Sequence, residues 1–187
     1  LPPIVFETVG LWIELPEGLR RMIVSGERHF MGGIHATEHA AISLFPLLAI
    51  CDRNDIGGIS YPLHPQLGRS AIFIYDGYPG GVGLAAKGYE ALEDLLDRTR
   101  LLIAGCRCES GCPSCIHSPK CGNGNQPLDK EASRLLLEVL TGMQPLESST
   151  EEPAAAPAEI PAAIPAVPRK SFREQGKLLY FDLETLR

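Results

Sequence analysis

Five of the six cysteines in this 187-residue chain lie between Cys106 and Cys121, in the order C-x-C-x3-C-x2-C-x5-C. The segment is rich in Gly, Pro and Ser and poor in large apolar residues, so it cannot fold by burying its own side chains. A metal ion held by four thiolates supplies the missing cross-link, and a C-x2-C pair is typical of structural zinc sites. The cluster therefore predicts a zinc knuckle.

The choice of four ligands rests on which way each cysteine faces. Cys106 and Cys108 alternate along the chain and are expected to point in opposite directions. We therefore predict that the zinc ligands are Cys108, Cys112, Cys115 and Cys121. Cys106 or His117 could substitute for one of them. Gly111 lets the backbone turn sharply, and this geometry can aim backbone N–H groups at the sulfurs.

Two alternatives to a zinc site are two disulfides with a spare thiol, and an iron–sulfur cluster. Disulfide frameworks belong to small secreted scaffolds, whereas this chain is 44% hydrophobic and shows no signal peptide. No apolar run approaches the roughly 18 residues of a membrane span, so we expect no membrane partner and a cytoplasmic location. The chain begins Leu-Pro-Pro and is expected to be a piece of a longer protein.

Apolar periodicity predicts an α+β fold. Alternating or continuous apolar runs predict strands over 4–15 and 71–75. Helical spacing predicts three main helices, over about 33–50, 84–102 and 130–140. Pro46 should kink or break the first helix, Asp129 should cap the last one, and Gly142 should end it. The fold class is thus a small mixed domain with a few strands, three main helices and a four-cysteine zinc knuckle, followed by a linker and a terminal strand.

Composition divides the chain into three parts. Residues 1–143 are expected to form the folded domain, 144–170 a Pro/Ala/Glu-rich linker, and 171–187 the truncated start of a second domain. The last part reads as a strand with Asp182 and Glu184 on one face. Two such carboxylates are the arrangement that holds divalent metals in nucleases.

A second metal motif lies on the first predicted helix. His35 and His39 share a helix face and Glu38 lies beside them, which is the H-x-x-E-H pattern of inverted zinc peptidases. Such an enzyme needs a further carboxylate, and Glu90 or Glu93 could supply it. The alternative is a histidine–carboxylate group that only caps or bridges packed elements.

Two further features argue against simple ligand-binding functions. The glycine-rich loop 77–83 lacks the Lys-Ser/Thr of a P-loop and the G-x-G-x-x-G spacing, so a tight turn with positive φ is the better prediction. The net charge of −6 shows no basic excess. Any DNA contact is therefore expected to be local, with a partner domain supplying most phosphate contacts.

The cysteine segment carries a specific resemblance. G-C-P-S-C-I-H-S-P-K-C-G-N-G-N-Q-P-L-D-K, with upstream H-A-T-E-H-A, C-D-R-N-D-I-G-G and I-F-I-Y-D-G-Y-P-G-G-V-G, resembles the C-terminal zinc-binding domain of MrfA/YprA-like DEAD/DEAH-box DNA helicases of superfamily 2. The resemblance spans about residues 1–143 and implies a role in DNA repair. It implies the same four zinc ligands, with Cys106 as the alternative, and leaves the histidine pair as a family feature without an assigned role.

The tail resembles a different family. Y-F-D-L-E-T is similar to the first motif of DEDD-type exonucleases with an RNase H-like fold, which implies that Asp182 and Glu184 bind metal. The chain has neither G-x-x-x-x-G-K-S/T nor D-E-x-H/D, so ATP and magnesium are expected only in helicase domains outside it. We therefore predict a non-catalytic accessory module whose partners are DNA, an upstream helicase core and a downstream exonuclease domain. A pure protein or nucleic-acid interaction module is the remaining alternative.

Overall fold

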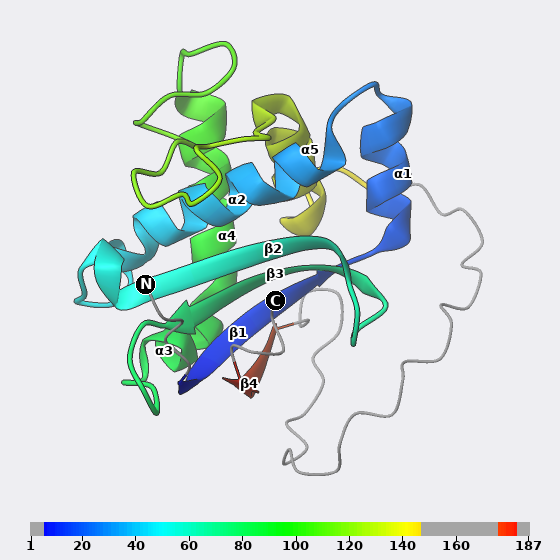
Figure 1. The fold of residues 1–187 in the computed structure, drawn as a ribbon. Coiled ribbons are helices and arrows are strands. Elements are labelled where there is room, and N and C mark those ends of the chain that lie inside the picture. The colour runs from blue at the N-terminus through cyan, green and yellow to red at the C-terminus, as the bar shows by residue number, and fades with distance from the viewer. Residues whose placement is uncertain (1–5, 147–175, 183–187) are drawn as a thin grey trace.

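The computed structural model describes residues 6–146 and 176–182, with an antiparallel sheet in the order β2-β3-β1-β4 (Figure 1). Strand β1 (Glu7–Leu15) pairs with β3 (Arg69–Asp76) on one side and with β4 (Gly176–Asp182) on the other, and β2 (Ile56–His64) pairs with β3. The two predicted strands are confirmed as β1 and β3, although residues 4 and 5 of the first prediction lie outside the described residues.

The two faces of β1 enter different clusters, as strand alternation requires. Leu11, Ile13 and Leu15 face the helices and belong to the main hydrophobic core. Trp12 points to the other face, directly opposite Phe73 of β3, with the ring centroids 6.1 Å apart. Trp12 therefore packs in a small second cluster with Ala71 and Phe73, apart from the main core.

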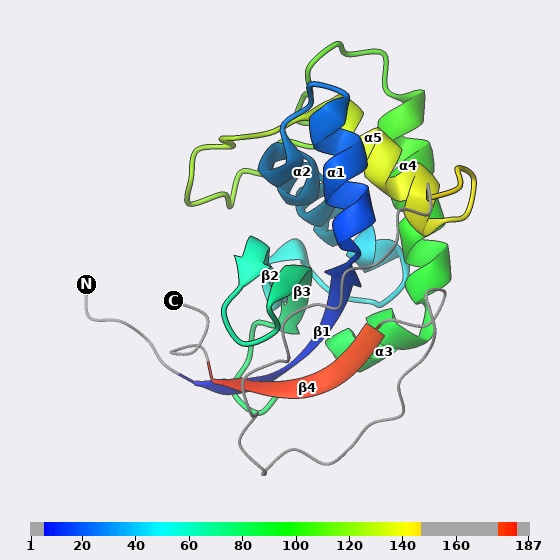
Figure 2. The same ribbon diagram turned by 90° about the vertical axis from the view of Figure 1, so that its right-hand side faces the viewer.

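The larger helices gather on one side of the sheet (Figure 2). They are α1 (Glu17–Ser25), α2 (Phe30–Leu44), α4 (Leu92–Gly105) and α5 (Lys130–Leu140), while the shorter α3 (Leu84–Glu90) contacts β1 and β3. Helix α2 is central: it packs on β2 and contacts both α4 and α5.

Small residues bring α2 and α5 close together. A Cβ built on Gly33 would lie 2.7 Å from the Cβ of Ala132, too close for any real side chain. Next to this contact the hydroxyls of Thr37 and Ser133 share a 2.7 Å hydrogen bond in the buried interface. Asp129 caps α5 by accepting from the amide of Ala132 at 2.8 Å, as predicted.

Several boundaries differ from the expectations. The predicted break at Pro46 is confirmed, because α2 ends at Leu44 and a short 3₁₀ turn, η1 (Phe45–Leu47), follows. A single helix over 84–102 is wrong: the chain breaks at Ala91, which separates α3 from α4. Helix α1, strand β2 and the 3₁₀ turn η2 (Arg53–Asp55) were not predicted, but the α+β class with clustered cysteines is confirmed.

The glycine-rich loop after β3 is filled by a side chain of the protein itself. The buried carboxylate of Asp76 accepts hydrogen bonds from four consecutive backbone amides, at residues 82–85, over 2.6 to 3.2 Å. Gly83 has φ of 89°, which favours glycine. The loop is therefore the tight turn that was predicted, and its amides are already satisfied.

The predicted terminal strand is present as β4, although Glu184 and most of the predicted linker lie outside the described residues. Among the helices of residues 6–146, none is long and apolar enough to cross a membrane.

Candidate metal centre

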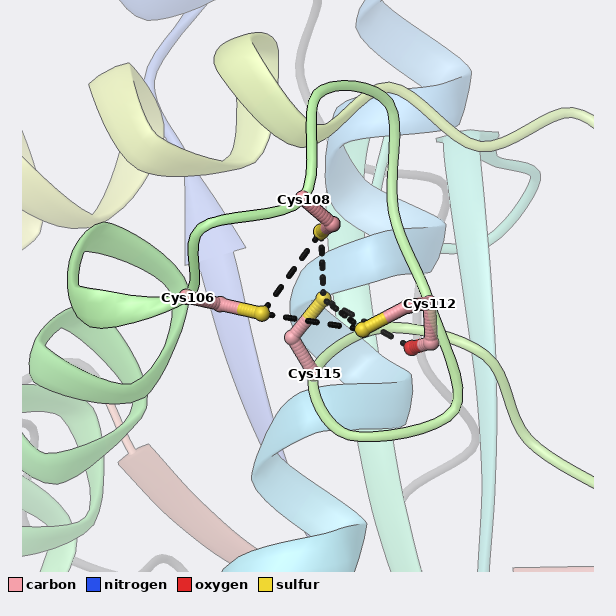
Figure 3. A group of neighbouring side chains, drawn as sticks. All are labelled: Cys106, Cys108, Cys112 and Cys115. Carbon is pink, nitrogen blue, oxygen red and sulfur yellow. Dashed lines mark hydrogen bonds between the residues drawn. The ribbon is translucent and has the colours of Figure 1, made fainter.

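Four cysteine sulfurs converge where the chain leaves α4. Cys106 is the C-cap of that helix and has extended backbone angles (φ −77°, ψ 127°). The chain then turns, so that the sulfurs of Cys106, Cys108, Cys112 and Cys115 point toward one another (Figure 3). The sulfur of Cys106 lies 3.6 Å from the sulfur of Cys108 and 3.6 Å from that of Cys112. The sulfur of Cys115 lies 3.5 Å from that of Cys108 and 3.7 Å from that of Cys112.

These separations fit a zinc ion and exclude disulfides. Four sulfurs placed about 2.3 Å from a tetrahedral zinc ion are about 3.8 Å apart. Four sulfur–sulfur distances of 3.5–3.7 Å are close to that edge length, whereas a disulfide bond measures about 2.05 Å. All six cysteines are free thiols. The donor set therefore matches a closed structural zinc site.

The turn around Cys112 prepares its sulfur to bind a cation. Gly111 has φ of 124°, and a Cβ there would lie 2.5 Å from the side chain of Ile116, so glycine is required. The backbone amide of Ser114 donates to the Cys112 sulfur and, with Cys106, lowers the pKa of the Cys112 thiol to about 7. The predicted sharp turn and its sulfur-directed amide are both confirmed.

A buried lysine supports the other half of the loop. The Lys130 side chain is only 6% exposed, and its ammonium donates to the carbonyl oxygens of Cys106 and Cys108, at 2.7 and 2.5 Å. A zinc ion with four thiolates carries a net charge of −2, so a cation held beside it is stabilised. Sequence reasoning assigned no role to Lys130, and its place at the start of α5 gave no signal of one.

The cluster is continuous with the hydrophobic core. Cys115 and Ile116 are buried within it, and the other three cysteines pack against it. Lys130 also connects the loop after α4 to the first turn of α5. A metal ion bound here would thus brace α4 and α5, the two helices that flank the knuckle.

Cys121, predicted as the fourth ligand, lies elsewhere. Its sulfur is 3.5 Å from Nε2 of His35, and these two residues form a second potential metal-binding group with His39. Cys106 takes the fourth corner of the cysteine cluster. The argument that Cys106 and Cys108 face opposite ways assumed an extended strand, but the chain turns between them and their sulfurs lie 3.6 Å apart.

The histidine pair is buried on α2 above β2. Burial lowers the pKa of His39 to about 4 and raises that of Glu38 to about 7, the latter opposed by a hydrogen bond with Ser60. Glu90 and Glu93, the proposed extra peptidase ligands, are exposed and belong to neither group of metal-binding side chains in the described part of the chain. His117 belongs to neither group as well.

Known proteins match this domain. A family model described as the MrfA Zn-binding domain matches residues 37–116. The protein MJ1572.1 of Methanocaldococcus jannaschii is 42% identical over 112 residues, which cover 58% of this chain and 100% of that protein. This chain belongs to the MrfA zinc-binding domain family. The matched range contains all four cysteines of the cluster and ends before Cys121.

Larger members of the MrfA-like group are helicases. YprA of Bacillus subtilis, an ATP-dependent helicase, is 32% identical over 116 residues, covering 62% of this chain and 15% of YprA. The helicase MrfA bound to DNA and AMPPNP aligns with 29% identity and a TM-score of 0.47, covering 68% of this chain and 15% of that one. The chain therefore spans only a small part of the helicases that it matches. The match to YprA does not favour a peptidase.

Proposed function

We propose that this chain is the zinc-binding module of an ATP-dependent DNA helicase and that it performs no catalysis itself. The four-cysteine cluster carries this proposal. Four thiolates complete the tetrahedral shell of zinc and leave no position for a substrate or an activated water, which is the mark of a structural site. The helicase relatives carry the same domain as about 15% of their length.

The ligands in this proposal are Cys106, Cys108, Cys112 and Cys115. They replace the predicted set in one position, with Cys106 in place of Cys121. Two observations support the exchange: the four sulfurs are spaced as zinc requires, and the family match ends at residue 116. Zinc bound in small domains contributes on the order of 10 kcal/mol to folding, so the loop between α4 and α5 depends on it.

The motor belongs to the rest of the parent protein. ATP and magnesium bind there, and the module lies beside it as a rigid body that helps to guide or separate DNA strands. Because its net charge is −6, the module makes only a minor share of the contacts to the DNA phosphates, and the motor makes most of them. The free thiols fit the reducing conditions of the cytoplasm.

The remaining parts of the chain complete the proposal. Residues 1–143 form the zinc domain, 144–170 a linker, and 171–187 the start of a DEDD-type exonuclease with Asp182 and Glu184 as metal ligands. The support for the last part is the Y-F-D-L-E-T sequence. Further acidic nuclease motifs after Arg187 in the parent protein would support it, and a different type of domain there would refute it.

Cysteine substitution in the parent helicase tests the main proposal. Cys112→Ser should remove sulfur-bound zinc and reduce DNA unwinding, while the isolated chain hydrolyses no ATP. Cys51→Ser is the matched control, since Cys51 belongs to neither group of metal-binding side chains. A parent helicase that keeps its fold and full unwinding activity after losing this zinc would refute a structural role.

A further inference from the structure

A second cluster of metal-binding side chains lies on α2, away from the four-cysteine site. His35 and His39 are 5% and 6% exposed, one helical turn apart, with ring centroids separated by 4.3 Å. Cys121 approaches them from the loop that follows the knuckle. One ligand atom from each of the three lies within 4.8 Å of the other two.

The hydrogen bonds of the two imidazoles settle which nitrogen is free. Nδ1 of His35 lies 2.9 Å from the carbonyl oxygen of Pro127, and Nδ1 of His39 lies 2.9 Å from that of Ile116. A carbonyl oxygen can only accept, so each Nδ1 carries a proton. In a neutral ring Nε2 then offers its lone pair. Histidines that bind metal are oriented by such a bond from the other ring nitrogen.

The loop that carries Cys121 is held in place by its own hydrogen bonds. Asn125 accepts from the amide of Ser118 at 2.7 Å and donates to its carbonyl oxygen at 3.1 Å. The backbone amide of Asn125 donates to the Cys121 sulfur at 3.3 Å. This hydrogen bond fixes the position of the sulfur beside the two imidazoles, as the bonds around metal-binding side chains do.

The single thiol of Cys121 cannot donate a hydrogen bond to both imidazole nitrogens of this group. Cys121 has one S–H hydrogen and can donate it to Nε2 of His35, at 3.5 Å, but not at the same time to Nε2 of His39. A divalent cation accepts all three lone pairs together. Two imidazoles and one thiolate are a ligand set that zinc takes in proteins.

The fourth position of such a cation is open. The three side chains line a cavity of about 300 Å³, together with Glu38, Ser60 and Lys120. Zinc sites with three protein ligands keep water in the fourth position. This is the feature that distinguishes the cluster from the closed four-cysteine site.

We propose that His35, His39 and Cys121 bind a second zinc ion, with water as the fourth ligand facing this cavity. The ion joins α2 to the loop after the knuckle and fixes that loop against the domain. It also gives a role to Cys121, the cysteine of the 106–121 segment that lies outside the four-cysteine site. The proposal needs no peptidase activity, and it rests on the proposed function only in requiring that Cys121 is not a ligand of the first zinc.

Zinc content and X-ray absorption of the purified chain test the proposal, with excess metal removed by a mild chelator. We expect two zinc ions per chain, with Zn–S distances near 2.3 Å and additional Zn–N distances near 2.0–2.1 Å. Cys121→Ser should lower the content from two to one and leave only the sulfur signal. Cys51→Ser should leave both ions in place.

Other outcomes separate this proposal from the first one. A wild-type chain with one zinc bound only to sulfur overturns the second site and leaves the first intact. Two ions that both survive Cys121→Ser and His39→Gln also overturn it. Loss of the sulfur-only signal in Cys112→Ser, with the nitrogen signal retained, supports both sites. A circular dichroism spectrum like that of the wild type excludes misfolding as the cause of a loss.

Discussion

Lys130 allows the electrostatics of the four-cysteine site to be tested without touching a ligand. Its ammonium makes two hydrogen bonds, to the carbonyl oxygens of Cys106 and Cys108, and it is almost completely buried. Hydrogen bonds from a charged donor contribute about 1.5–3 kcal/mol each. Burial of the ammonium offsets part of this gain. We expect Lys130→Met to cost about 3 kcal/mol, because it also leaves the −2 charge of the zinc–thiolate cluster uncompensated.

The assay is zinc competition with a chromogenic chelator. If the zinc-bound state loses about 3 kcal/mol of stabilisation, the dissociation constant for zinc at the four-cysteine site becomes roughly 150-fold larger. Lys130→Gln keeps a neutral donor and should lie between the wild type and Lys130→Met. Lys87→Met, on the exposed surface of α3, is the control and should change nothing. If Lys130→Met bound zinc as tightly as the wild type, the proposed charge compensation would be refuted.

Three further predictions concern the scaffold. Asp76→Asn should lower the free energy of unfolding by about 2–4 kcal/mol in denaturant titrations, because a buried carboxylate that accepts four amide hydrogen bonds is replaced by a group that also donates; an unchanged midpoint would contradict this. Gly33→Ala should cost about 1–3 kcal/mol through overpacking, and the second change Ala132→Gly should restore part of it; additive losses would argue against the close contact. Burial lowers the pKa of His64, so the unfolded chain takes up its proton first and stability should fall as the pH drops below about 6.5; His64→Phe should flatten that part of the pH profile, and an unchanged slope would contradict the assignment.

Much of the fold could be predicted because local signals agreed with the final packing. Alternation identified β1, Pro46 ended the helical segment before η1, and Asp129 capped α5. Helix α1 carried a weaker signal that was overlooked: Leu19 and Ile23, its two fully buried residues, are spaced four apart.

Strand β2 could not be recognised because its glycines serve the packing of another element. A Cβ on Gly58 would lie 2.5 Å from the side chain of Ile42 and 3.1 Å from that of Glu38, both on α2. Gly57 is similarly close to the ring of Tyr75. The Gly-Gly pair reads as a turn in the sequence, but it lets a helix approach the strand closely.

At the metal centre, too, features set by sequence spacing could be predicted, and contacts that form only on folding could not. Spacing alone predicted that the cysteines gather around metal. It could not show that Cys121 leaves the group, because its histidine neighbours lie more than eighty residues earlier in the chain and meet it only after α2 and α5 have packed. Lys130 was missed for the same reason, since its partners are backbone carbonyls of the preceding loop.

The visible spectrum of the cobalt-substituted Cys106→Ser variant tests the central claim most directly, because Cys106 is the ligand on which sequence and structure differ. The wild-type chain should show thiolate-to-cobalt charge-transfer bands from a four-sulfur centre. We predict that Cys106→Ser weakens these bands and destabilises the domain, whereas Cys121→Ser retains those of the four-sulfur centre. A Cys106→Ser variant with an unchanged four-sulfur spectrum would contradict the account.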